Sequence, residues 1–325
     1  MSNIGPGLHD IVTVSTALEG RIVATPTIRL NSSRLTSALP DCAAVHMKLE
    51  LFQQAGSFKS RGVLLAIDAM SDAEKAAGVT AVSAGNHALA TAWGAKAAGL
   101  SAKVVMTKSA DPIRVEGCKA LGAEVVLADD VGQAFETVDR LVADEGRTML
   151  HPFESPFMTL GAATCGLELA QSVEHLDYAI IPIGGGGLIS GMAPAVRAVH
   201  SDCTIIGVEP FGADSMYRSF EKGEPVRLEN VDTIADSLGA PMALPNSFAI
   251  AKEHVSEIVR IEDTAMREAM RRLMDGLKIM AEPACAAATA AICGPLRERL
   301  AGKSIAIIAC GSNIGVEKFS RLTAA

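Results

Sequence analysis

The chain has 325 residues, 49% of them hydrophobic and 20% charged, so it is long enough for about two domains and too apolar to be largely disordered. It carries 29 basic and 37 acidic side chains, a net charge of −8, and only 4% aromatic residues. Because nucleic-acid binding needs a positive surface and often stacked aromatic rings, this balance argues against DNA or RNA as a main partner.

The cysteines and the apolar segments indicate the compartment. The seven cysteines are an odd number, lie far apart and include no C-x-x-C pair, which is typical of a reducing compartment and not of a disulfide framework or a zinc site. The N-terminal residues show no basic segment followed by an apolar one, and no uncharged apolar run approaches the roughly 18 residues of a membrane helix. We therefore expect a cytoplasmic protein with no membrane contact.

Short runs rich in valine and isoleucine alternate along the chain with longer segments of helical period. The predicted strands are residues 79–83, 103–107, 124–128, 178–182, 204–209 and 304–309. The predicted crossover helices are residues 87–98, 113–121, 132–145 and 188–199. This alternation predicts an α/β fold with doubly wound parallel sheets. No Pro/Gly/Ser-rich linker separates two independent domains.

The first candidate site is the segment GSFKSRG at residues 56–62, in which Lys59 stands among small residues before a helical run. One interpretation is a solvated lysine, since most lysines are exposed and the first turn of a helix favours acidic residues. The other is a Schiff-base lysine, whose partial burial keeps the amine unprotonated and able to attack a carbonyl group. The local pattern leaves both interpretations open.

The second candidate is a run of four glycines at residues 184–187, between a predicted strand and a predicted helix start. Without Cβ atoms the backbone can approach an anion closely, and successive N–H groups at a helix N-terminus supply hydrogen-bond donors. A plain turn needs only one or two glycines, so this run favours a phosphate-binding loop. It does not match G-x-G-x-x-G, and no Lys-Ser or Lys-Thr pair follows, which argues against NAD-type and P-loop sites.

Two further motifs directly follow predicted strands, where ligands bind in open α/β sheets. The first, SAGNH at residues 83–87, is equally consistent with an ordinary helix N-cap. The second, CGSN at residues 310–313, begins with a cysteine that alone reads as a small buried hydrophobic residue.

In this order along the chain, GSFKSRG, SAGNH, GGGGL and CGSN resemble the signature motifs of the fold-type II, pyridoxal-phosphate-dependent serine/threonine dehydratases, a family that includes serine racemase. The similarity extends from about Thr25 to the end of the chain. It implies a tryptophan synthase β-like architecture of two doubly wound α/β domains. The large cofactor-binding domain would be residues 1–53 plus 148–325, and the small inserted domain residues 54–147. Relatives also imply a homodimer.

The resemblance also implies roles for individual residues. Lys59 would form the Schiff base with pyridoxal 5′-phosphate and then act as the base at the substrate Cα. The other cofactor-binding residues would be Phe58 against the ring, Asn86 at the ring hydroxyl, Gly184, Gly185, Gly186, Gly187 and Leu188 at the phosphate, Cys310 at the ring nitrogen, and Glu282. Ser83, Ala84, Asn86 and His87 would bind the substrate. A neutral thiol at the ring nitrogen weakens the ring as an electron sink, which favours elimination over transamination.

The implied reaction is β-elimination from a β-hydroxy amino acid such as L-threonine, L-serine or 3-hydroxyaspartate, giving a 2-keto acid and ammonia. The racemases of the family carry a serine where this chain has Ala84, so we rank an ammonia-lyase above an amino-acid racemase, the first alternative. The second alternative is a non-catalytic module that binds a phosphometabolite. The apolar residues within 151–161 and 237–248 favour an apolar β-substituent on the substrate.

Some members of the family bind a divalent cation, Mg²⁺ or Ca²⁺, through a glutamate, a backbone carbonyl and an aspartate. Glu209 and Ala213 match the first two ligands, but Ser215 stands where the aspartate would fall. A hard cation requires several oxygen ligands with negative charge among them, so this sequence lacks one expected carboxylate.

Overall fold

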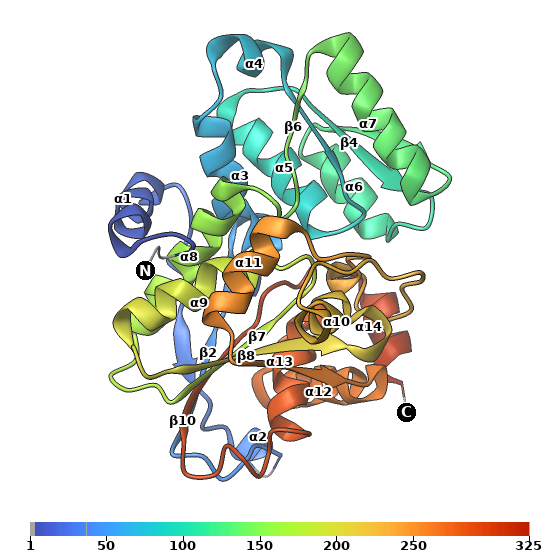
Figure 1. Ribbon diagram of the computed structural model, residues 1–325. Coiled ribbons are helices and arrows are strands. Elements are labelled where there is room, and N and C mark those ends of the chain that lie inside the picture. Colours follow the sequence, from blue (N-terminus) through green and yellow to red (C-terminus); the bar gives the residue numbers. More distant parts are fainter. Residues whose placement is uncertain (1–3, 37, 325) are drawn as a thin grey trace.

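The computed structural model describes residues 4–36 and 38–324. Its strands form two separate sheets in two lobes, with four strands in the upper lobe of Figure 1 and six in the lower lobe. Helices connect the parallel strands of both sheets, which confirms the predicted α/β class and its doubly wound sheets. Among the described residues, no helix is long and apolar enough to cross a bilayer.

The six-stranded sheet is the core of the lower lobe. Its strands, in spatial order, are β1 (Thr27–Arg29), β2 (Ala44–Lys48), β10 (Ser304–Ile308), β7 (Tyr178–Pro182), β8 (Thr204–Pro210) and β9 (Glu257–Ile261). β1 is antiparallel to β2, and the other neighbouring strands are parallel. The helices of this lobe are α1 (Leu8–Leu18), α2 (Ser33–Thr36), α8 (Pro156–Gln171), α9 (Gly187–Val199), α10 (Ser215–Lys222), α11 (Pro245–His254), α12 (Asp263–Leu277), α13 (Pro283–Cys293) and α14 (Val316–Thr323).

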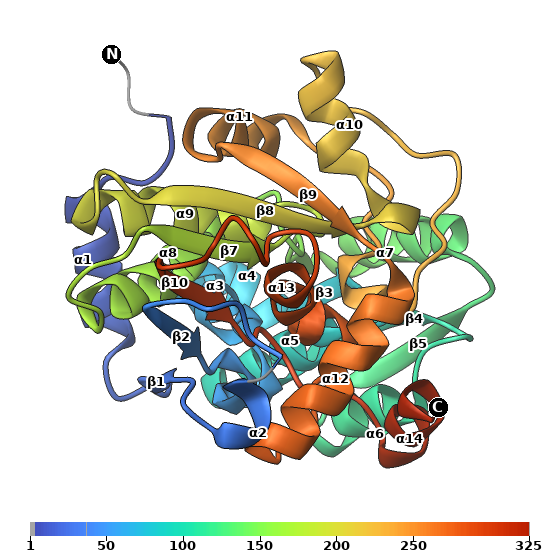
Figure 2. The same cartoon turned by 90° about the horizontal axis from the view of Figure 1, so that it is seen from below.

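Helices cover both faces of this sheet. α13 packs against four of its strands, and α12 packs on the outer side of α13 (Figure 2). Because α13 consists mostly of alanine, its small side chains let it approach the sheet closely, and its residues Pro283–Ile292 are buried. α9 packs against β7, with α8 and α11 beside it.

The four-stranded sheet is parallel throughout, in the order β5 (Glu124–Ala128), β4 (Ala102–Thr107), β3 (Val79–Val82) and β6 (Thr148–Met149). The helices of this lobe are α3 (Lys59–Asp68), α4 (Asp72–Ala77), α5 (Asn86–Ala98), α6 (Pro112–Ala120) and α7 (Val131–Glu145). Four short 3₁₀ turns complete the chain: η1 (Glu50–Phe52), η2 (Gln54–Gly56), η3 (Phe211–Ala213) and η4 (Asp236–Leu238).

The six predicted strands and the four predicted crossover helices are all present, with ends that agree or differ by one residue. The prediction missed β1, β2, β6 and β9. In β2 and β9, with sequences AVHMK and EIVRI, polar residues interrupt the apolar ones, so neither reads as a continuous buried run. The domain limits, residues 1–53 plus 148–325 and residues 54–147, stay a prediction; β6 lies just past the second limit but pairs with β3.

A buried ion network fixes α3 between the two lobes. Arg61, fully buried, donates to Glu50 at 2.8 Å and to Glu168 of α8 at 2.6 Å. Lys48, at the end of β2, donates to the same Glu168 carboxylate at 2.6 Å. Burial alone would raise the pKa of Glu50, but the Arg61 guanidinium holds it below its ordinary value. Removing one partner from such a network costs about 3–5 kcal/mol because it leaves a buried charge unpaired.

The same two helices touch through their backbones. A Cβ atom on Gly161 of α8 would lie 2.3 Å from the backbone nitrogen of Gly62 in α3. Glycine is therefore required at this crossing because no larger residue leaves α3 in place.

We predict that Gly161→Ala lowers the free energy of unfolding by about 1–3 kcal/mol, because the added methyl group forces α3 and α8 apart. Gly132→Ala, in the first turn of α7, is the matched control. Its Cβ would meet only the side chain of Asp130 at 3.2 Å, so the higher helix propensity of alanine makes the change neutral or stabilising by up to about 1 kcal/mol. Chemical denaturation followed by circular dichroism measures both. Equal stabilities of the two variants would contradict the close crossing.

Candidate active site

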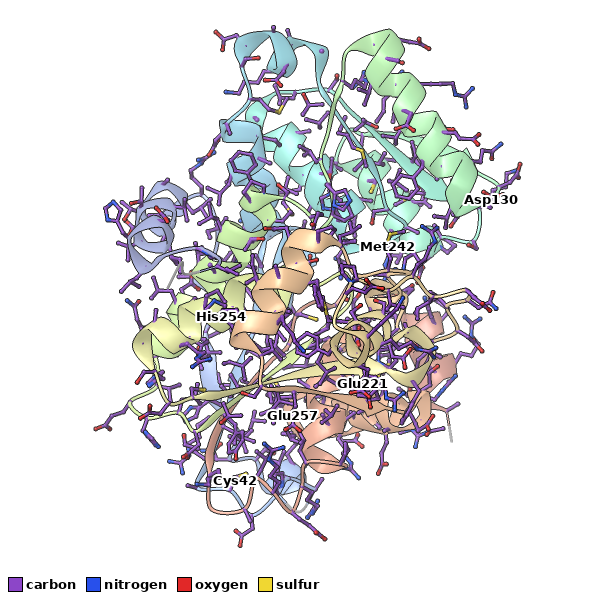
Figure 3. The ribbon with its side chains drawn as sticks, viewed as in Figure 1. Cys42, Asp130, Glu221, Met242, His254 and Glu257 are labelled. Atoms are coloured by element: carbon purple, nitrogen blue, oxygen red, sulfur yellow. The ribbon has the colours of Figure 1, made fainter. Side chains whose placement is uncertain are left out.

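The carboxyl ends of the parallel strands in both sheets face one cavity of about 330 Å³. Its lining contains every predicted cofactor- and substrate-binding residue: Phe58, Lys59, Ser83, Ala84, Asn86, His87, Gly184, Gly185, Gly186, Gly187, Leu188, Glu282 and Cys310. The two predicted cation ligands, Glu209 and Ala213, are not in this lining. The cavity lies at the junction of the two lobes. One lining segment ends directly before Met242, the residue that Figure 3 labels at this junction.

Lys59 is the first residue of α3, and its amine points into the cavity wall. Its Nζ donates a hydrogen bond to the backbone oxygen of Pro152 and lies 5.0 Å from the centre of the Phe58 ring. Desolvation by the surrounding protein lowers the pKa of Lys59 to about 8. At pH 7 roughly a tenth of this amine is therefore unprotonated, against less than about a thousandth of an ordinary lysine, which favours the Schiff-base interpretation over a solvated lysine.

The glycine run forms a tightly packed loop in which added side chains would clash with neighbouring residues. A Cβ on Gly185 would lie 2.2 Å from the Phe153 ring, and a Cβ on Gly187 would lie 2.9 Å from the same residue. Gly186 has φ of 92°, a left-handed conformation that favours glycine, and it caps the N-terminus of α9. The first N–H groups of α9 have no partners within the helix, so the loop presents donors and a positive dipole to an anion.

The SAGNH segment follows β3 and starts α5. Asn86 is held on both sides: its side chain donates to Glu282 at 2.6 Å and accepts from Asn313 at 2.7 Å. His87 Nε2 donates a hydrogen bond to the backbone oxygen of Leu150 at 2.7 Å, while the buried Nδ1 has no hydrogen-bond partner. Burial and the neighbouring Lys59 lower the pKa of His87 to about 3, so its ring is neutral.

Cys310 follows β10 and is buried in the cavity wall. Burial raises the pKa of its thiol well above the ordinary value, so the group is neutral. It therefore provides a weak, uncharged partner for a ligand atom, where a carboxylate would provide a charged one.

The prediction missed Arg114, a buried guanidinium from α6 that joins the upper lobe to the lower one. It donates to Asp236 at 2.8 Å, to Glu282 at 3.1 Å and to the backbone oxygen of Asn313 at 2.8 Å. Burial raises the pKa of Glu282, and Arg114 limits that rise. No local sequence signal marks Arg114, because Asp236, Glu282 and Asn313 are all more than a hundred residues away from it in the chain.

The predicted cation ligands form a different arrangement. Both oxygens of the buried Glu209 carboxylate accept backbone N–H groups, from Met216 at 3.0 Å and Tyr217 at 2.7 Å. The neighbouring Asp214 pairs with Arg218 and Arg260. Among the described residues, no three acidic, histidine or cysteine side chains are placed to hold a metal ion. Because backbone N–H groups occupy the oxygens of Glu209 and two arginines pair with Asp214, the residues at this position do not fit a divalent cation.

An amine of lowered pKa, an aromatic neighbour and a backbone anion loop define a site for a cofactor that carries an aldehyde, a ring and a phosphate. A family model described as pyridoxal-phosphate dependent enzyme matches residues 18–311, and the chain belongs to this family. Its cofactor is pyridoxal 5′-phosphate. The fold-type II serine/threonine dehydratase resemblance is thereby confirmed.

Individual relatives cover nearly the whole chain. It is 48% identical over 278 residues to the phenylserine dehydratase of Ralstonia pickettii, covering 86% of this chain and 85% of that protein. It is 33% identical over 315 residues to the L-threo-3-hydroxyaspartate ammonia-lyase of a Pseudomonas species, covering 97% of each. The structure of maize serine racemase superposes with a TM-score of 0.90 at 30% identity, covering 98% of this chain and 96% of that one.

The lowered pKa of Lys59 predicts how the apoenzyme captures its cofactor. The neutral amine is the nucleophile, so the capture rate should rise about tenfold per pH unit below pH about 8 and level off above it. Stopped-flow absorbance of apoenzyme mixed with pyridoxal phosphate measures this rate. A rate that keeps rising toward the ordinary lysine value of 10.5 would mean that the amine is not desolvated.

Proposed function

We propose that this enzyme, an ammonia-lyase that removes the β-hydroxyl and α-amino groups from β-hydroxy amino acids, prefers substrates that carry an aromatic β-substituent. Bound pyridoxal phosphate supplies an electron-withdrawing ring that acidifies the substrate Cα proton and weakens the β-carbon–oxygen bond. The products are a 2-keto acid and ammonia. The observation that carries the substrate preference is the apolar wall of the cavity, which offers no free cation.

Lys59 is the general base in this proposal. Its Nζ accepts the Cα proton once the substrate is bound, and a pKa near 8 suits that task at neutral pH. The glycine loop at residues 184–187 binds the cofactor phosphate, and Phe58 packs against the cofactor ring. Cys310 would face the ring nitrogen as a neutral thiol, an arrangement that would favour loss of the β-hydroxyl group over transamination.

The start of α5 binds the substrate carboxylate. Backbone N–H groups at a helix N-terminus attract an anion, and Asn86 and Ser83 add polar side chains. The neutral His87 ring donates its Nε2 hydrogen bond to the backbone oxygen of Leu150, so His87 contributes through its backbone N–H group. Ala84 has no proton to deliver to Cα, which favours elimination over racemisation.

The apolar wall comes mainly from the upper lobe. Asp130, labelled in Figure 3, caps the N-terminus of α7, and Val131 and Phe135 lie in the first turns of that helix. Both line the cavity together with Val82 and Val105 of the four-stranded sheet. Phe135 is 42% exposed, so an aromatic substituent bound in the cavity would cover it.

The described lining residues offer no cation for a second substrate carboxylate. Lys59 is the base, and Arg114 is already paired with Asp236 and Glu282. A dicarboxylate such as 3-hydroxyaspartate would therefore bury an unpaired charge. The 48% identity with a phenylserine dehydratase supports the same preference.

A substrate panel tests this proposal. We expect kcat/KM for L-threo-phenylserine to exceed that for L-threonine and L-serine by about 10–100-fold, and 3-hydroxyaspartate to be the poorest substrate. Phe135→Ala should reduce the preference for phenylserine about tenfold while leaving L-serine nearly unchanged. Val142→Ala, on the same helix but outside the cavity lining, is the matched control.

Keto acid and amino-acid enantiomers are measured separately in the same reactions. A preference for 3-hydroxyaspartate, or equal activities of the Phe135 and Val142 variants, would contradict the substrate proposal. Inversion at Cα that outruns release of keto acid would favour the racemase alternative.

We further propose a cytoplasmic homodimer. All seven cysteines are free, which supports a reducing compartment. The dimer rests on the family resemblance, and light scattering of the purified holoenzyme tests it.

A further inference from the structure

Arg260 of β9 occupies the corner where the resemblance placed a divalent cation. It is the direct neighbour of Glu209 across the β8–β9 pair. Its guanidinium donates to Asp214 at 3.0 Å and lies over the Tyr217 ring, 3.9 Å from the ring centre, and near the Phe211 ring at 4.7 Å. A positive group that contacts two rings and a buried carboxylate thus lies on the strand beside Glu209, next to the position where the resemblance placed a cation.

This corner supports the phosphate-binding loop. Asp214 precedes α10, whose first N–H groups, from Met216 and Tyr217, donate to Glu209. Met216 is fully buried, and its Cε would lie 2.9 Å from a Cβ on Gly186. The start of α10 therefore packs directly beneath the glycine loop, while α10 itself lies beside the edge strand β9 (Figure 2).

The two arginines that pair with Asp214 are not equivalent. The Asp214 side chain is 1% exposed, whereas the Arg260 side chain is 30% exposed and that of Arg218 is 58% exposed. Exposed pairs contribute little, because water screens them and holding the side chains costs entropy. Arg260, held between two rings, therefore provides most of the charge compensation that keeps Asp214 and the start of α10 in place.

We propose that Arg260 is a positioning residue that takes the place of the divalent cation. It neutralises Asp214, orders the segment from Phe211 to Tyr217, and thereby keeps the glycine loop in the shape that binds the cofactor phosphate. Cofactor binding consequently does not depend on Mg²⁺ or Ca²⁺. This proposal rests on the cofactor and not on the identity of the amino-acid substrate.

Equilibrium titration of the full-length apoenzyme with pyridoxal phosphate tests this proposal through the cofactor Kd. In the unaltered protein, we expect the Kd to agree within about twofold in EDTA, Mg²⁺ and Ca²⁺. Arg260→Ala should raise the Kd about tenfold, and Arg260→Lys, which keeps the charge but not the planar stacking, should raise it less. Arg218→Ala is the matched control, with a change within about twofold.

Two results would overturn the proposal. One is a Kd of the unaltered protein that weakens more than about fivefold on chelation and recovers with Mg²⁺ or Ca²⁺, which would show a bound cation. The other is an Arg260→Ala apoenzyme that melts at a lower temperature but binds the cofactor as tightly as Arg218→Ala, which would make Arg260 purely structural. Neither result depends on which substrate the enzyme prefers.

Discussion

The chemistry of this protein depends on keeping the amine of Lys59 desolvated. The buried Arg61, two residues later in the same helix, holds it in that position. Arg61 joins α3 to η1 and α8 through Glu50 and Glu168. The start of α3, with Lys59, therefore cannot swing toward water without breaking buried ion pairs. The amine stays desolvated, its pKa stays low, and it remains a nucleophile and a base near neutral pH.

The contacts between the two lobes also determine the shape of the site. Each lobe contributes only part of the cavity: the upper lobe supplies the SAGNH segment and the apolar wall, and the lower lobe supplies the glycine loop and Cys310. Arg114 connects them by pairing with Asp236 and Glu282. Because Glu282 also accepts from Asn86, the same contacts that join the lobes orient a residue of the site. Movement of one lobe against the other would thus change the site directly.

The sequence predicts those site residues that lie in short motifs, and it misses those whose roles depend on distant partners. Lys59, the glycine loop, Asn86 and Cys310 lie in short motifs at strand ends, so four fragments in one order predict a single site, and the cavity contains them all. Arg114, by contrast, acquires its role only from partners distant in the chain.

The predicted cation site shows that a resemblance in sequence does not fix how the matching residues are used. Glu209 is present in the sequence, but its oxygens accept backbone N–H groups, and an arginine on the neighbouring strand supplies the positive charge. Only the pairing of β8 with β9 reveals that arginine, because β9 is one of the strands that the apolar pattern did not predict.

Borohydride reduction of the holoenzyme followed by peptide mass spectrometry shows whether the amine of Lys59 carries the cofactor. We expect a reduced pyridoxyl phosphate adduct on the peptide that contains Lys59, and a colourless protein with no adduct after Lys59→Ala. An adduct on a different lysine of the unaltered protein, or a Lys59→Ala protein that still turns yellow and forms a stoichiometric adduct, would contradict it.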